Sequence, residues 1–95
     1  ARLDLVALYV SSDPSVEYIY IDGHTDLIGS RRDNRELSKL RAEKVTAYLL
    51  DKGVPAAKIV SRYHGERYPS ASNNTAQGRE RNRRVTIRLE KSESN

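Results

Sequence analysis

The sequence predicts an α/β sandwich, with a mixed β-sheet and helices packed on one side. Residues 16–64 are predicted to form a strand, a helix and a second strand, an order that normally gives a right-handed crossover between parallel strands. An amphipathic segment precedes this unit and an alternating segment follows it. The 95 residues fit one compact domain with a modest core. We expect the domain to span residues 1–91 and to be followed by a disordered tail at 92–95.

The composition restricts the possible functions. Without cysteine, the chain cannot form a disulfide framework, a thiolate metal site or a cysteine nucleophile. No stretch approaches the roughly 20 apolar residues of a membrane span, and no signal-peptide pattern is present. The formal net charge of +4 is mild for a nucleic-acid-binding domain. Because the sequence starts inside a predicted helix, we expect it to be a fragment of a longer protein.

The first helix and the first strand are predicted from their periodicity. The helix runs from Arg2 to about Ser12, since apolar residues recur at helical spacing, and it stops before Pro14. Its apolar stripe consists of Leu3, Val6, Ala7 and Val10. The strand runs from Val16 to Asp22 and has apolar or tyrosyl residues on both faces, which is typical of a central strand covered on both sides.

A long helix is predicted from about Asn34 to Lys52. Asp33 or Asn34 can cap its start, and Gly53 followed by Pro55 ends it. Its predicted apolar arc consists of Leu37, Leu40, Val45, Tyr48 and Leu49.

Three further elements are predicted downstream. The second strand spans Ile59 to His64 and is followed by a loop from Gly65 to Asn74. Thr75 to Asn82 then forms one or two helical turns. Arg84 to Glu90 alternates polar and apolar residues, which predicts a half-exposed strand near a sheet edge.

Asp26 and Arg41 are the strongest candidate binding residues. At 100° per residue, Arg41 falls about 40° from Leu37 and about 20° from Tyr48, so it points along the middle of the buried face of the long helix. A buried guanidinium needs an anionic partner. Asp26 follows the strand against which this helix must pack. Two interpretations stay open: an internal salt bridge, or two charges that flank a cleft and jointly hold a zwitterion.

A metal centre and an enzyme active site are alternative hypotheses. Asp22, His24, Asp26 and His64 carry metal-binding groups, but their spacing matches no HExxH-type motif. No serine lies in a Gly-x-Ser-x-Gly elbow, and no pair of carboxylates stands out as catalytic. We therefore expect no metal, no cofactor and no catalytic residue.

A basic cluster precedes and enters the last predicted strand. It consists of Arg79, Arg81, Arg83, Arg84 and Arg88. Such a cluster can bind a polyanion or nucleic acid, although acidic residues interrupt it and no nucleic-acid-binding signature accompanies it. A polyanion binder therefore stays an alternative, as does a structural assembly module with an internal Asp26–Arg41 pair. Asn82 and Arg83 can also close over the same cleft as Asp26.

The region around Asp26 and Arg41 contains a signature with fixed spacing. Its residues are Thr25-Asp26, Leu37-Ser38, Arg41-Ala42, Val45 and Leu49. With this signature, the chain resembles the OmpA-like peptidoglycan-binding domain, the C-terminal module of outer-membrane porin-like proteins, peptidoglycan-associated lipoproteins and flagellar stator proteins. The resemblance covers residues 3–90.

The resemblance implies non-covalent, non-catalytic binding of peptidoglycan through the meso-diaminopimelate residue of its stem peptide. By motif position, Asp26 and Arg41 hold the charged ends of that residue. The other implied site residues are Asn34 and Leu27 in the loop beside it and Arg83 and Asn82 on the far side. The implied location is the periplasm of a Gram-negative bacterium, at the cell wall and outer membrane, in a parent protein anchored outside this segment.

The chain departs from the family pattern at its start. Family members usually have a strand before the first helix, so we expect that this strand was removed or that another segment replaces it. Its removal would leave a sheet edge open to self-association, which makes a homo-oligomer one expectation. The loop from Gly29 to Arg32 and the tyrosines Tyr18 and Tyr20 are similar to flagellar accessory proteins of the MotY type. That similarity adds flagellar-motor proteins to the candidate partners.

Overall fold

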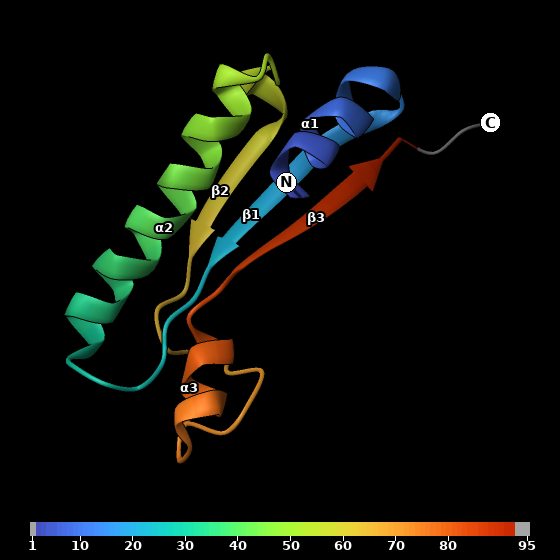
Figure 1. Cartoon of the computed structure of the whole chain (residues 1–95). Coiled ribbons are helices and arrows are strands. Elements are labelled where there is room, and N and C mark those ends of the chain that lie inside the picture. The colour runs from blue at the N-terminus through green and yellow to red at the C-terminus, as the bar shows by residue number, and fades with distance from the viewer. Residues whose placement is uncertain (1, 93–95) are drawn as a thin grey trace.

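The computed structural model describes residues 2–92 and shows an α/β fold with a three-stranded mixed sheet (Figure 1). The elements are α1 (Arg2–Ser12), β1 (Val16–Gly23), α2 (Arg31–Asp51), the 3-10 helix η1 (Ala56–Lys58), β2 (Ile59–Tyr63), α3 (Ala76–Asn82) and β3 (Val85–Lys91). The strand order is β2-β1-β3, with β1 parallel to β2 and antiparallel to β3. The predicted fold class, the central first strand and the parallel crossover are therefore confirmed. α3 lies beyond one end of the sheet (Figure 1).

The core lies between β1 and the two longer helices. Ile19 and Ile21 of β1 are fully buried and belong to one cluster with residues of α1 and α2. The helical members that are most deeply buried are Ala7, Val10, Ala42 and Leu49. Val16 is also fully buried, because an irregularity between Val16 and Tyr18 shifts the alternation of side chains along the strand.

The second face of β1 is covered by charged side chains, and the prediction of a strand buried on both faces is wrong. Tyr18 is 41% exposed. The guanidinium groups of Arg62 and Arg88 lie 4.9 and 4.6 Å from the centre of the Tyr20 ring, and the Tyr20 hydroxyl donates to Glu90 at 2.6 Å. Tyrosines suit this face because their rings accept cations while their hydroxyl groups stay hydrated.

α2 starts earlier than predicted. Its N-cap is Ser30, whose Oγ accepts a hydrogen bond from the Asp33 backbone N–H at 3.0 Å. The prediction that Asp33 or Asn34 caps the helix is therefore wrong. Ser30 is a good N-cap because its short side chain reaches the third backbone N–H of the helix.

The buried face of α2 also differs from the predicted apolar arc. Leu37 and Leu40 are 40% and 58% exposed, and in the first half of α2 small or polar side chains face the sheet, whereas Leu49 of the predicted arc is fully buried. The buried residues of α2 are Asn34, Ser38, Ala42 and Leu49. β1 approaches the helix so closely that a Cβ atom added to Gly23 would lie 2.1 Å from the Ser38 carbonyl oxygen. Leucines do not fit between backbones at this separation.

The two edges of the sheet follow the prediction closely. β2 ends at Tyr63, one residue before the predicted end, and β3 is the edge strand beside β1. Ser92, which the sequence assigned to the tail, donates from its backbone N–H and its hydroxyl to the Ser15 carbonyl at 2.7 and 3.2 Å. The remaining tail positions, 93–95, lie outside the described residues. Between residues 2 and 92, no helix combines the length and the apolar character of a membrane span.

Candidate functional site

The candidate site lies where β1 ends, beside the start of α2 and the junction of α3 with β3. The backbone of His24 exchanges hydrogen bonds with that of Arg84, at 2.8 and 3.3 Å. The next residue, Thr25, donates from its backbone N–H to the Gly65 carbonyl at 2.8 Å. The chain is thus held on two sides immediately before it reaches Asp26.

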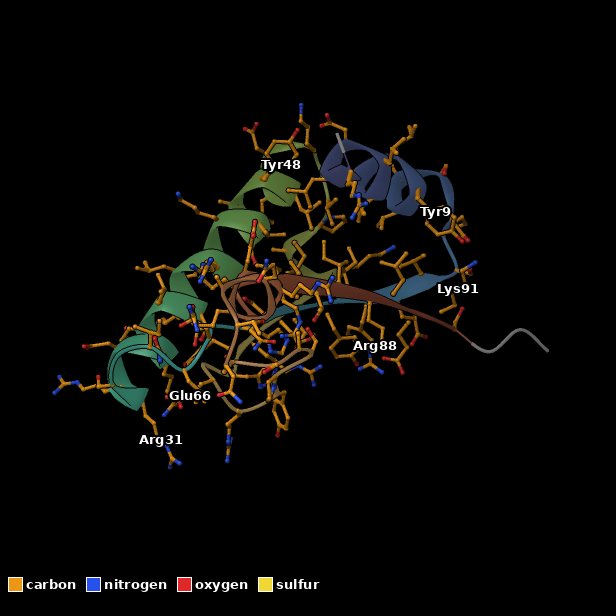
Figure 2. The ribbon with its side chains drawn as sticks, turned by 60° about the horizontal axis from the view of Figure 1, so that its bottom comes forward. Tyr9, Arg31, Tyr48, Glu66, Arg88 and Lys91 are labelled. Carbon is orange, nitrogen blue, oxygen red and sulfur yellow. The ribbon has the colours of Figure 1, made fainter. Side chains whose placement is uncertain are left out.

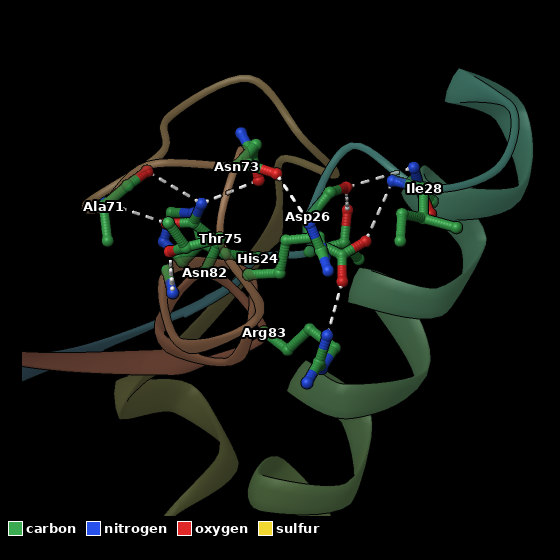
Figure 3. A network of polar contacts seen from close by, with 12 residues as sticks. His24, Asp26, Ile28, Ala71, Asn73, Thr75, Asn82 and Arg83 are labelled. Atoms are coloured by element: carbon green, nitrogen blue, oxygen red, sulfur yellow. Dashed lines mark hydrogen bonds and ion pairs between the residues drawn. The ribbon is translucent and has the colours of Figure 1, made fainter.

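Asp26 is a buried carboxylate with two different partners. Its Oδ2 lies 2.6 Å from Nη1 of Arg83, and its Oδ1 accepts a hydrogen bond from the Ile28 backbone N–H at 3.0 Å (Figure 3). Burial raises the pKa of Asp26, but the hydrogen bonds from Arg83 and Ile28 outweigh it and bring the pKa below its ordinary value. Asp26 is therefore ionised at neutral pH, although its exposed fraction is only 6%.

Arg41 reaches the same end of β1. Its partner is not Asp26, which the salt-bridge interpretation required. Its Nη1 donates to the His24 carbonyl oxygen at 3.1 Å, and its side chain is half-buried. Within the described part of the chain, the cation paired with Asp26 is Arg83. The hypothesis of an internal Asp26–Arg41 salt bridge is therefore wrong. A backbone carbonyl holds the guanidinium in place, and among residues 2–92 no carboxylate forms an ion pair with it.

Asn34 and Leu27 flank Asp26 in different ways. Asn34 is buried, and its Nδ2 donates to the Asp26 carbonyl at 3.2 Å and to Oε1 of Glu66 at 3.4 Å. It therefore ties the Asp26 loop to the segment after β2. Leu27 is 50% exposed and lies on the surface of the loop. Sequence reasoning missed Glu66, because nothing in the local pattern links it to position 34.

Asn82 is fully buried and fixes the loop before α3 instead of facing the cleft. Its Oδ1 accepts from the backbone N–H groups of Ser70 and Ala71, and its Nδ2 donates to the Ala71 carbonyl and to Oδ1 of Asn73 (Figure 3). These contacts use the hydrogen-bonding capacity of the amide. Asn82 thus positions the segment that carries Arg83 and has no free group for a ligand.

Four arginines of the basic cluster contact other groups of the protein. Arg79 donates to the Asn73 carbonyl at 3.0 Å, and Arg84 donates to the Tyr68 carbonyl at 2.9 Å. Arg83 pairs with Asp26, and Arg88 stacks over Tyr20. Bonds to carbonyls and ring stacking leave the charges of Arg79, Arg84 and Arg88 in place, so the polyanion interpretation stays a prediction.

The histidines and Asp22 form a polar cluster on the face of the sheet away from α2. His64 Nε2 lies 2.6 Å from Oδ1 of Asp22, which also accepts from Arg62 Nε at 2.8 Å. The ring of His24 stacks on that of His64 with their centres 5.1 Å apart. Within residues 2–92, no three acidic, histidine or cysteine side chains group in a way that would hold a metal ion.

His24 is expected to make folding stability depend on pH in mildly acidic solution. Its burial, with the nearby charges of Arg84 and His64, lowers its pKa from 6.5 to about 4, against the opposing effect of Asp22. The unfolded chain therefore binds more protons between these values, and the free energy of unfolding falls as pH drops from about 6.5 to about 4. Urea unfolding at several pH values should show this slope, and His24→Gln should flatten it. An unchanged slope in the variant would assign the effect to other groups.

The chain is similar to known proteins of one family. The sequence profile described as the OmpA family matches residues 1–83. Outer membrane protein A of Bordetella avium is 46% identical over 74 residues, which are 78% of this chain and 38% of that protein. The sodium-type flagellar protein MotY of Vibrio parahaemolyticus is 33% identical over 88 residues, 93% of this chain and 30% of that protein. The chain therefore spans well under half of these relatives.

A solved structure supports the same relationship at the level of the fold. The crystal structure of the peptidoglycan-associated lipoprotein from Burkholderia pseudomallei superposes with a TM-score of 0.87 and 31% sequence identity. The superposition covers 93% of this chain and 74% of that one. The sequence and the fold thus lead to the same group of relatives.

Proposed function

Because the chain belongs to the OmpA family, we propose that it binds peptidoglycan non-covalently and without catalysis, through the meso-diaminopimelate residue of the stem peptide. In a stem peptide, this residue carries a free ammonium and a free carboxylate on one carbon. A receptor for it must present both signs of charge within a few ångströms of each other. Asp26, in the loop after β1, and Arg41, in the middle of α2, provide that combination.

One observation supports the proposal above the others: the Asp26 carboxylate and the Arg41 guanidinium are both fixed at the end of β1. Asp26 is buried and ionised, and Arg41 is held by the carbonyl of His24, two residues earlier. In the proposed complex, Asp26 receives the ammonium. Arg41 has further N–H groups beside the one bonded to His24, and these bind the carboxylate.

Arg83 completes the proposed site. Arg83 neutralises Asp26, and its side chain is 40% exposed. An incoming ammonium shares or replaces this contact, which frees the Arg83 guanidinium to turn toward the ligand carboxylate. Leu27 covers the aliphatic part of the ligand from the loop, and Asn34 holds the loop in place. Asn82 contributes by positioning Arg83.

We further infer that the domain anchors its parent protein to the cell wall from within the cell envelope, in the periplasm. The relatives support this location, since they include an outer membrane protein and a protein named as peptidoglycan-associated. A flagellar role stays a prediction, because identity to MotY is 33% whereas identity to outer membrane protein A is 46%.

Cosedimentation with two kinds of cell wall tests the proposed recognition. The protein is expected to pellet with purified peptidoglycan that contains meso-diaminopimelate and to stay in the supernatant with a lysine-type wall. Lysine lacks the side-chain carboxylate that Arg41 binds. Both walls should be matched in mass and assayed at the same ionic strength, because general charge attraction weakens with salt. Equal binding to the two walls would contradict recognition of diaminopimelate.

A further inference from the structure

A cavity lies beside the Asp26 loop and shares only Leu27 with the proposed diaminopimelate site. Its volume is about 560 Å³. It is lined by Leu27, Arg31, Arg35, Tyr63, His64, Glu66 and Arg67. A smaller neighbouring cavity shares Arg31, Arg35 and Tyr63 with it. Asp26, Arg41 and Arg83 line neither cavity. Figure 2 shows Arg31 and Glu66 together at this end of the molecule, beside the start of α2.

The cavity carries an excess of uncompensated positive charge. It contains three arginines and one glutamate. Within residues 2–92, no ion pair joins Arg31, Arg35 or Arg67 to a carboxylate. Arg35 lies over the Tyr63 ring, 5.4 Å from its centre, and this stacking leaves its N–H groups free to donate. The start of α2 adds a partial positive charge at the same place.

The cavity is structurally connected to the Asp26 loop. Leu27 lines it and directly follows Asp26 in the chain. Asn34 donates both to the Asp26 carbonyl and to Glu66 in the cavity wall. A peptide bound at Asp26 can therefore continue over Leu27 into the cavity without leaving the surface.

From this arrangement we infer that the cavity binds a second carboxylate of the same stem peptide, the α-carboxylate of the D-glutamate that is γ-linked to diaminopimelate. This inference rests on the proposed function. A singly charged carboxylate suits the lining better than a phosphate, because Glu66, and Glu36 in the neighbouring cavity, repel a dianion more strongly. The two sites together would then recognise two neighbouring residues of the stem peptide, D-glutamate and diaminopimelate.

Three soluble ligands test the inference by calorimetry: free meso-diaminopimelate, the tripeptide L-Ala-γ-D-Glu-meso-diaminopimelate, and the same tripeptide with the glutamate α-carboxyl amidated. The native chain is expected to bind the acidic tripeptide roughly 10-fold more tightly than the amidated one. The double variant Arg35→Gln with Arg67→Gln should lose this preference and keep its affinity for free diaminopimelate. Lys39→Gln is the matched control, since Lys39 also lies over Tyr63 but lines neither cavity.

The outcomes separate the two proposals. Equal affinity of the native chain for the two tripeptides, or a preference that survives in the double variant, would overturn the second carboxylate site alone. If the native chain binds none of the three ligands, the diaminopimelate proposal fails and the inference fails with it.

Discussion

Asp26→Ala and Arg41→Ala are each expected to abolish cosedimentation with diaminopimelate-type peptidoglycan while the chain stays folded. Each change removes one partner of a charged, hydrogen-bonded contact, a loss that typically costs about 2 to 5 kcal/mol of binding free energy. That corresponds to roughly 30-fold to 5,000-fold weaker binding. The fold should tolerate both changes. In Asp26→Ala, the released Arg83 is 40% exposed and can be hydrated, and in Arg41→Ala only one side-chain hydrogen bond to the backbone is lost.

The measurement needs a control that removes a paired carboxylate elsewhere. Asp13→Ala serves this purpose, because Asp13 pairs with Lys91 at 3.1 Å beside the start of β1, far from the site. It should pellet with peptidoglycan as the native chain does. If both site variants still pellet, the proposed site is wrong. Circular dichroism decides whether a loss of binding reflects unfolding, which would assign the two residues a structural role instead.

Gly23→Ala is expected to destabilise the fold by about 3 kcal/mol or more, at or above the upper end of the usual cost of overpacking. The added Cβ would meet the Ser38 carbonyl oxygen at 2.1 Å. Because the obstacle is backbone, no substitution at position 38 relieves it, and β1 must move away from α2. That movement also withdraws the His24 carbonyl from Arg41. Peptidoglycan binding should therefore weaken together with stability.

Gly53→Ala provides the comparison for this prediction. An added Cβ at Gly53 meets nothing within 4 Å, so its cost is confined to the positive φ of 94°. That cost is about 1 to 2 kcal/mol. Urea unfolding should rank Gly23→Ala well below Gly53→Ala in stability. The same loss of stability in both variants would contradict the proposed close contact between β1 and α2.

Much of the fold could be predicted because its elements follow local rules. The hydrophobic periods and the breaks at Pro14 and Gly53 define α1, β1 and the end of α2. The buried face of α2 could not be predicted in this way. Whether Leu37 or Ser38 faces the sheet depends on how near β1 comes, and that distance is determined by Gly23, a residue in another element.

The candidate site shows the same limit. Charge and position were enough to select Asp26, Arg41 and Arg83, and the structure brings all three to one end of the sheet. Sequence reasoning left the pairing of Asp26 and Arg41 open, and it could not find that the partner of Arg41 is a backbone carbonyl, because every residue has one. Asn82 has the side chain of a ligand-binding residue, but its burial depends on the fold of the 70–73 loop, which has no periodic pattern.

The placement of Asp26 after a central strand has a mechanical consequence. β1 is paired with β2 on one side and with β3 on the other. At its end, the Gly23 carbonyl accepts a hydrogen bond from the His64 backbone N–H. Tension that enters through a ligand at Asp26 would run along the axis of β1. This tension would shear the hydrogen bonds between β1 and β2 and between β1 and β3, so many of them would have to break together. A tether attached there would resist pulling better than one attached to an edge strand, which can be peeled away one bond at a time.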